Sequence, residues 1–355
     1  MVSLLINLTW LAPNELLASS FYLLRWIAYA ALFPIVMSFD EKFKKKLMVF
    51  LFIDGLVILL AGFLQYFFFN SLKSLYYLGW DEHMHRVFST FFDPNFAGAF
   101  FVLFFLFVGG VFVSRIPLSK EKPHPSPSTP VKQAASLRPA LKGEGVIFNK
   151  YFLFFVLGLT LIAIFLTFSR AALLGLIAGS VVFLFLIKKK KLLFVLLAVM
   201  AVFVAIASPQ FYDENMNLFR TASSNARLAN YATALKFIHD RPLLGVGFNS
   251  YRYAKESYGY KTNWTLAPSH ADAGVDNSFL FVLATTGIIG FIAYCGLLIT
   301  ILKRAYYLYR KKNNILSVVV ISSIAALCVN ALFINSLFFP PLMLWMWVLV
   351  GLTEA

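Results

Sequence analysis

Nine predominantly apolar stretches limit what this chain can fold into more than any other feature. A helix needs about 20 apolar residues to cross the hydrocarbon core of a bilayer, and most of these stretches come close to that length. They lie at residues 18–38, 47–69, 95–114, 151–168, 171–187, 192–208, 277–301, 315–333 and 342–353. Only 13% of the residues are charged and 60% are hydrophobic. The sequence therefore predicts an all-α polytopic membrane protein with about nine transmembrane helices.

The distribution of basic residues predicts the side of the membrane on which each loop lies. The loops at 40–46, 115–150, 188–191 and 302–314 fall on one side and carry 20 of the 31 Lys and Arg residues. Cytoplasmic loops of membrane proteins are enriched in these residues, so this side is expected to be the cytoplasm. The net charge of +15 is explained by topology, and no nucleic-acid partner is predicted.

Two long polar segments interrupt the apolar ones within what we interpret as a single membrane domain, residues 1–355. Residues 115–150 are rich in Pro, Ser and Lys without apolar periodicity, which predicts a disordered cytoplasmic loop. Residues 209–275 fall on the opposite side and form a large external loop, the expected place for catalysis. Apolar residues at helical spacing predict an amphipathic surface helix within it. They are Leu228, Tyr231, Leu235 and Ile238.

The first residues, MVSLLINLTWLAP, are apolar but too short to span a bilayer. We expect them to be the end of an earlier helix or to lie along the outer membrane interface.

Arginines on or near the outer side are the first candidates for binding an anion. Arg170 follows Ser169 in a tight turn and is backed by small residues that let another helix approach closely. Arg227 stands at the start of the predicted surface helix, where exposed N–H groups favour an anion, although a solvated side chain is the alternative. Arg25 lies within the first apolar stretch and either reaches outer-leaflet phosphate or meets a structural partner such as Gln65.

A metal site is a weaker hypothesis. The cluster Asp81, Glu82, His83 and His85 contains ligand types, but a solvated loop explains it better, since neither helical nor strand spacing brings the two histidines together with confidence. No metal and no cofactor are predicted.

Three blocks of sequence, in order, carry a resemblance to a known family. They are SRAALLGLIAGSVVFL, RLANYATALKFIHDRPLLGVGFNSY and DNSFLFVLATTGIIGFI. Together they resemble the O-antigen ligase and polysaccharide polymerase family of membrane glycosyltransferases, with a GT-C-like fold. The resemblance implies transfer of a glycan from an undecaprenyl pyrophosphate donor to a glycan or lipid acceptor. It also implies a bacterial multi-pass protein acting at the outer face of the cytoplasmic (inner) membrane.

The resemblance also implies roles for particular residues. Arg170 in SRAA and Arg227 in RLANYATAL match family arginines that bind the donor pyrophosphate, and Arg25 lies in a more weakly similar segment. Ligases of the family commonly have a His before the Asn of the last block, where this chain has Asp276. The general base is thus Asp276 by position or His270 by chemistry, and Asp276 could instead cap the following helix.

Two other functions compete with this one. A transporter or flippase of lipid-linked glycan would use Arg25, Asp54 and Arg170 to line a polar path, but no internal repeat or paired broken helices are evident in the sequence. A protein O-oligosaccharyltransferase would share the donor and differ only in the acceptor.

The predicted topology is tested by labelling single cysteines from outside intact cells. In a background lacking Cys295 and Cys328, Ser257→Cys should react with an impermeant maleimide and Ser128→Cys should be protected. Labelling of Ser128→Cys together with protection of Ser257→Cys would reverse the orientation.

Overall fold

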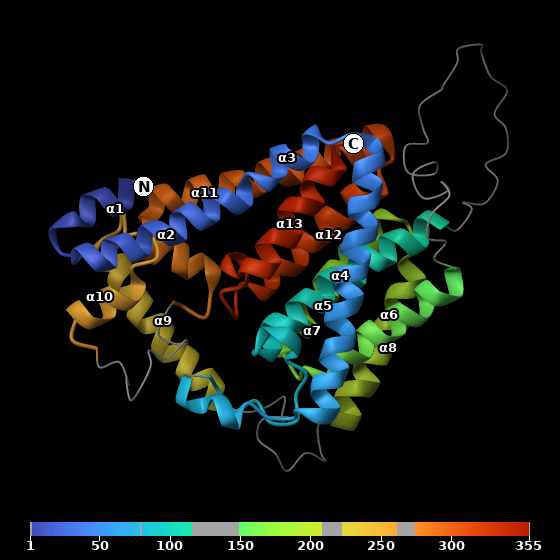
Figure 1. Ribbon diagram of the computed structural model, residues 1–355, viewed down its shortest axis with the longest axis horizontal. Coiled ribbons are helices and arrows are strands. Elements are labelled where there is room, and N and C mark those ends of the chain that lie inside the picture. The colour runs from blue at the N-terminus through green and yellow to red at the C-terminus, as the bar shows by residue number, and fades with distance from the viewer. Residues whose placement is uncertain (1, 79, 116–148, 208–221, 261–273, 355) are drawn as a thin grey trace.

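The computed structural model describes residues 2–78, 80–115, 149–207, 222–260 and 274–354, and every regular element within them is a helix. The first seven helices are α1 (Val2–Ile6), α2 (Pro13–Ala30), α3 (Leu32–Ser38), α4 (Glu41–Phe68), α5 (Pro94–Arg115), α6 (Lys150–Leu166) and α7 (Arg170–Leu186). The remaining six are α8 (Lys190–Ala207), α9 (Ala222–Asp240), α10 (Tyr251–Ser257), α11 (Ser278–Lys312), α12 (Ile315–Asn330) and α13 (Pro340–Thr353). Figure 1 shows their arrangement.

The predicted all-helical fold is confirmed, because each of the nine apolar stretches lies on helix in the described residues. Within the described residues, four helical segments are long and apolar enough to cross a membrane: Pro13–Ser38, Glu41–Phe68, Pro94–Ser114 and Ser278–Lys312. Four shorter apolar helices accompany them, namely α6, α7, α12 and α13. The count of nine spans stays a prediction. Most of the predicted cytoplasmic loop, residues 116–148, lies outside the described residues, as do parts of the external loop.

Helix α5 forms the centre of the bundle (Figure 1). Its rings at Phe100, Phe104 and Phe107 are almost fully buried, and all three contact Trp345 of α13 at ring-centroid distances of 5.1–6.2 Å. Burial of aromatic side chains from neighbouring helices, packed edge to face, holds these helices around α5.

Helices α7 and α12 approach each other closely, as the small residues behind Arg170 predict. A Cβ atom at Gly175 would lie 3.1 Å from the backbone oxygen of Ala326, and one at Gly179 would lie 3.1 Å from that of Ser322. Only glycine leaves room for backbones this near. The close packing fixes the position of α7 and hence of Arg170 at its first turn.

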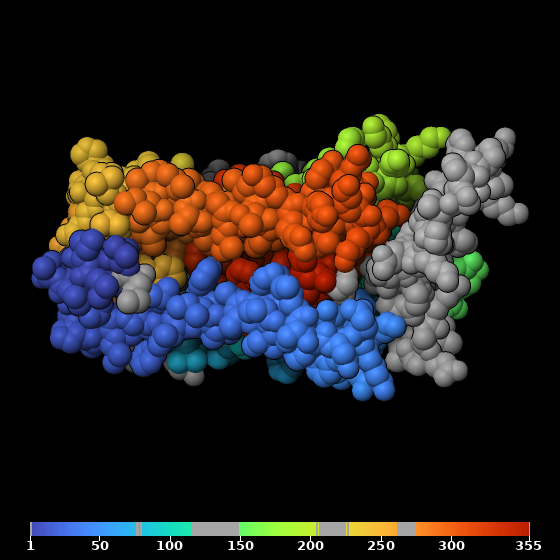
Figure 2. Space-filling view, turned by 90° about the horizontal axis from the view of Figure 1, so that it is seen from above, coloured from blue at the N-terminus to red at the C-terminus, as the bar shows by residue number. Residues whose placement is uncertain are grey.

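Helices α2, α3 and α11 line one side of the molecule. Figure 2 shows α2–α3 and α11 as two ridges, with parts of α13 between them. In the long apolar segment formed by α2 and α3, only 6% of the apolar 18-residue stretch is buried inside the protein. The corresponding share in α5 is 72%. The outward apolar side chains of α2 therefore face the surroundings of the bundle, as expected of a helix that contacts lipid.

Helix α11 is broken at Gly287, which corrects the expectation of an uninterrupted helix over 277–301. Gly287 has φ 66° and ψ −172°. The turn at 242–247 pairs with the broken stretch through Val246 N–H to Ala284 O (2.9 Å) and Ile288 N–H to Pro242 O (2.9 Å). These bonds satisfy backbone groups that the break releases, as membrane-embedded backbone requires.

The N-terminal segment packs against the same break. The hydroxyl of Ser3 bonds to the backbone oxygens of Leu244 (2.6 Å) and Thr285 (2.8 Å), and Asn7 Nδ2 donates to Gly245 O (3.1 Å). Residues far apart in sequence are thus joined, and α1 is held on α11.

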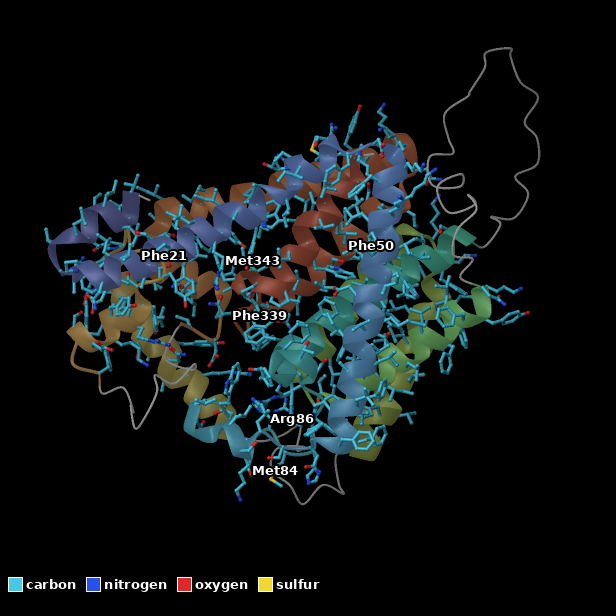
Figure 3. The ribbon with its side chains drawn as sticks, viewed as in Figure 1. Phe21, Phe50, Met84, Arg86, Phe339 and Met343 are labelled. Carbon is cyan, nitrogen blue, oxygen red and sulfur yellow. The ribbon has the colours of Figure 1, made fainter. Side chains whose placement is uncertain are left out.

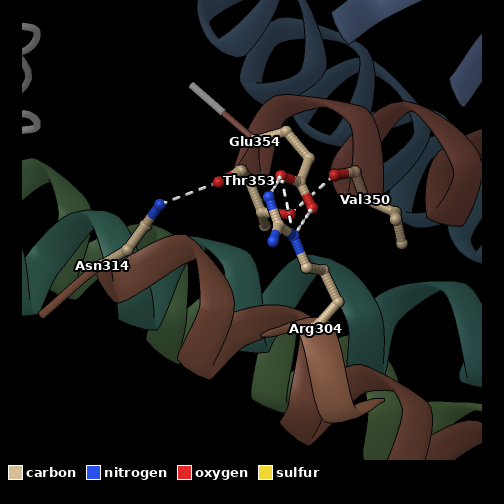
Figure 4. A network of polar contacts seen from close by, with 5 residues as sticks. All are labelled: Arg304, Asn314, Val350, Thr353 and Glu354. Atoms are coloured by element: carbon tan, nitrogen blue, oxygen red, sulfur yellow. Dashed lines mark hydrogen bonds and ion pairs between the residues drawn. The ribbon is translucent and has the colours of Figure 1, made fainter. Parts of the chain in front are cut away.

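The opposite end of α11 is joined to the end of α13 (Figure 4). Arg304 donates to both carboxylate oxygens of Glu354 at 2.6–3.1 Å, and Asn314 Nδ2 donates to Thr353 O at 3.0 Å. A two-pronged guanidinium–carboxylate pair is geometrically specific, so it sets how these two helix ends meet.

The break at Gly287 leads to a prediction about thermal stability, and Gly296 in the same helix offers a matched control. In Gly287→Ala the new Cβ would collide with the Leu243 carbonyl. The φ and ψ of this position also belong to a region that essentially only glycine adopts, at a cost of about 1–3 kcal/mol for another residue, so thermal unfolding in detergent should begin at a lower temperature. Gly296→Ala has open space and a helical backbone, so its midpoint should be unchanged or higher. Equal midpoints for both variants would show that the break is not constrained.

Candidate functional site

The start of α7 is tied to the start of α5. Ser169 is the N-cap of α7, and its hydroxyl donates to Asn95 Oδ1 in the first turn of α5 at 2.8 Å. Asn95 N–H in turn bonds to Asp93 Oδ1 at 2.6 Å. Two helix N-termini therefore meet beside Arg170, and their dipoles add positive potential there.

Arg86, a buried arginine that the sequence did not indicate as a candidate, binds the backbone just before Ser169. Arg86 is 3% exposed, and its Nε donates to Thr167 O at 2.8 Å at the C-terminal end of α6. A cation at a helix C-terminus is favoured by the dipole and satisfies carbonyls that have no helical partner. Figure 3 shows Arg86 at the end of the bundle away from α3. In the sequence, Arg86 could have been recognised as a candidate because it lies in a predicted outer segment, where basic residues are few.

Gln65 holds the segment containing Arg86 in place and does not meet Arg25. Its Nε2 donates to the backbone oxygens of Phe69 (3.0 Å) and Arg86 (3.2 Å), and its Oε1 accepts from Phe88 N–H (2.8 Å) and Ser89 N–H (3.1 Å). These four bonds use the full capacity of an amide. The suggested pairing of Arg25 with Gln65 is therefore wrong.

The N-cap of α11 decides whether Asp276 caps this helix. Asn277 Oδ1 accepts from Phe279 N–H (2.9 Å) and Leu280 N–H (3.0 Å), so Asn277 is the N-cap. The alternative that Asp276 caps this helix is wrong. The carboxylate of Asp276 instead has a side-chain hydrogen bond with Asn230 of α9.

Helix α9 brings Arg227 near the start of α11. The hydroxyl of Tyr231, one turn from Arg227, lies 2.9 Å from the backbone oxygens of both Asp276 and Leu332. The predicted helix is confirmed, but its packed side differs from the expected one. Phe237 is fully buried in it, whereas Leu228 is 64% exposed.

Arg227 acts electrostatically on both other candidates. Burial raises the pKa of the Asp276 carboxyl, Arg227 opposes this, and the carboxylates of Asp93 and Asp81 raise the pKa further. Burial lowers the pKa of Arg170, and the positive charge of Arg227 lowers it again. The structure therefore gathers two guanidinium groups and three carboxylates around the starts of α5, α7 and α11.

Arg25 is not part of this cluster. The guanidinium of Arg25 lies 4.5 Å from the ring centroid of Tyr22 on its own helix, and Arg25 is not among the groups that shift the pKa of Arg170 or Asp276. His270 lies outside the described residues. Its role as base stays a prediction.

The cluster at 81–85 is not arranged as a metal site. Across the described parts of the chain, no group of three or more His, Cys, Asp or Glu side chains is placed to hold an ion. Backbone bonds from Leu72 N–H to Glu82 O and from His85 N–H to Asn70 O, both 2.8 Å, hold this segment against residues 70–72. Metal independence stays a prediction.

The polar path expected of a transporter is not supported by the position of Asp54. Its side chain is exposed on α4, on the face that carries Phe50 (60% exposed) and Val57 (58% exposed). Figure 3 labels Phe50 on this helix. Asp54 faces away from the packed bundle, so it does not line a route shared with Arg170.

Comparison with known families gives an independent result. The sequence profile of the family described as O-antigen ligase matches residues 154–295, from the first turns of α6 to the middle of α11. Residues 154–295 are therefore similar to the O-antigen ligase family. This confirms the resemblance drawn from the three sequence blocks. No curated protein matches the chain.

The O-antigen ligase segment contains Arg170, Arg227 and Asp276, the three residues that the fold brings together. It supports an O-antigen ligase-like glycosyltransferase role in a bacterial membrane protein. The segment from Trp80 to Asn95 lies outside the matched residues, although its Arg86 bonds to the end of α6 and its Asn95 to the N-cap of α7.

Proposed function

We propose that this protein transfers or polymerises glycan from an undecaprenyl pyrophosphate donor onto a glycan or lipid acceptor at the outer face of the bacterial cytoplasmic membrane. The observation that carries the proposal is the position of Arg227, which acts on both Arg170 and Asp276. A guanidinium that acts on both a second guanidinium and a partly buried carboxyl matches a reaction that needs a bound pyrophosphate and a base.

Arg170 and Arg227 are the proposed pyrophosphate ligands. They repel each other, as the lowered pKa of Arg170 indicates, and an anion between them would relieve that repulsion. A planar guanidinium matches phosphate oxygens with two parallel donors. Charge grows on the pyrophosphate as the glycosidic bond breaks, so donors already in place stabilise the transition state more than the ground state.

Asp276 is the proposed base. The carboxylate takes the proton of the acceptor hydroxyl, the hydroxyl oxygen bonds to the anomeric carbon, and the bond from that carbon to the pyrophosphate oxygen breaks. Undecaprenyl pyrophosphate leaves with the electron pair. Burial raises the pKa of Asp276 and so makes its carboxylate a stronger base, while Arg227 favours the ionised form that can accept a proton.

The function is tested with purified protein in lipid nanodiscs and an undecaprenyl pyrophosphate-linked oligosaccharide extracted from bacterial membranes. A ladder of products indicates a polymerase, and one transfer that requires a second glycolipid indicates a ligase. Transfer to a polypeptide indicates the oligosaccharyltransferase alternative. Absence of any transfer by the wild-type protein rejects the proposal.

Replacing Arg170 or Arg227 with Lys keeps the charge and removes the two-pronged donor. Losing one such donor costs about 3 kcal/mol, so each variant should lose about a hundredfold in rate with normal expression and insertion. Arg241→Lys is the matched control, because Arg241 is on the same side of the protein and contacts Asn7 and the Trp10 ring. Near wild-type rates in both variants would remove the arginines from the site.

The pH dependence of the rate tests Asp276. A base works when ionised, so activity should fall as pH drops through its pKa, at a higher pH than for an ordinary carboxyl because burial raises that pKa. Arg227→Gln removes the charge that opposes the rise, so the acid limb of its residual activity should move to higher pH. Arg227→Lys should leave the limb where it is. Identical acid limbs in the two variants would contradict the assignment.

A further inference from the structure

An aromatic pair made of the partly buried Trp80 and the exposed Phe92 lies beside the proposed site and is not used by the mechanism above. The rings of Trp80 and Phe92 have centroids 5.3 Å apart at an interplanar angle of 52°, and Phe92 is 40% exposed. Phe92 has a left-handed φ of 56°, which is unfavourable for a residue with a Cβ. The surrounding structure therefore imposes the position of this ring.

The neighbours of Phe92 show how it is held. The preceding residue, Phe91, is buried and packs edge to face on Phe339 at 5.7 Å, and Phe96 stacks on the same ring at 4.0 Å. Figure 3 shows Phe339 in the middle of the molecule, at the start of α13. Phe91 thus anchors the segment in the core while Phe92 points outward.

The segment is also tied to the proposed pyrophosphate site. Asp93 follows Phe92 and accepts from Asn95 N–H at 2.6 Å, and the Asn95 side chain accepts from Ser169, the residue before Arg170. Asp81 follows Trp80. The hydrogen bonds through Asn95 and Ser169 place Phe92 and its partner ring near the start of α7, and both carboxylates act electrostatically on Asp276.

We propose that Trp80 and Phe92 form the floor of a binding subsite for the acceptor sugar, with Asp81 and Asp93 accepting hydrogen bonds from its hydroxyls. The inference rests on the proposed function and names where the acceptor binds. A sugar ring has an apolar C–H face that packs on an aromatic ring and a rim of hydroxyls that donate to carboxylates. The donor pyrophosphate would be repelled by the two carboxylates. The alternative, that these rings are anchors in the membrane interface, is decided by the test.

The test measures the KM of each substrate separately, with the acceptor glycolipid extracted from the same membranes as the donor. Trp80→Leu and Phe92→Leu should each raise the acceptor KM about tenfold, because an aromatic contact of this kind contributes about 0.5–1.5 kcal/mol beyond its buried area, and leave the donor KM unchanged. Phe69→Leu is the matched control, since Phe69 is a 72% exposed ring at the end of α4.

A second variant covers the case in which the aromatic replacements do not fold. Asp81 is exposed, so Asp81→Asn should fold normally, and it should also raise the acceptor KM. An unchanged acceptor KM in Asp81→Asn, or in the folded leucine variants, overturns the subsite and leaves interface anchors as the explanation. A rise in the donor KM instead also overturns it. If the wild-type protein transfers no glycan, the proposed function itself fails, and that result is distinct from turnover with an unchanged acceptor KM.

Discussion

The backbone pairing between the turn at 242–247 and the broken stretch of α11 is the interaction on which the rest of the structure depends. Backbone groups at membrane depth must find partners within the protein, so a helix can be broken there only if another segment supplies them. Here Val246 and Pro242 do so. The same bonds attach the segment after α9 to α11. They therefore help to place α9, which carries Arg227, near the start of α11, which Asp276 directly precedes.

The second constraint is the meeting of helix ends. The ends of α5, α6, α7 and α11 leave backbone groups without helical partners, and side chains satisfy them one by one. Ser169 and Asn277 cap two N-termini, while Arg86 binds carbonyls at the end of α6. A place rich in helix N-termini suits an anion, and this is why Arg170 there is more than a topological anchor in our interpretation.

The charged side chains around the starts of α5, α7 and α11 form two regions of opposite charge. Arg170 and Arg227 make one part suited to a pyrophosphate, and Asp81 and Asp93 make another part suited to a hydroxyl-rich ligand beside the Trp80 and Phe92 rings. Asp276 is influenced by both groups. In the reaction that we propose, a charged donor and a neutral acceptor lie on either side of the base, and this charge pattern would keep the two apart.

The sequence by itself determined the helices, because apolar stretches of this length leave the backbone no alternative in a bilayer. It also indicated Arg170 and Arg227 as candidates for binding an anion, because they are cations between apolar segments, and that role stays a prediction. It also predicted the close approach to α7, since Gly175 and Gly179 fall on one face. Only the tertiary structure decided the cap of α11: Asp276 and Asn277 are both good capping residues, and the choice depends on the local backbone. The sequence did not predict the break at Gly287 or the role of Arg86. The backbone groups that they pair with lie about 40 and 80 residues away, and a local sequence pattern does not indicate contacts between such distant residues.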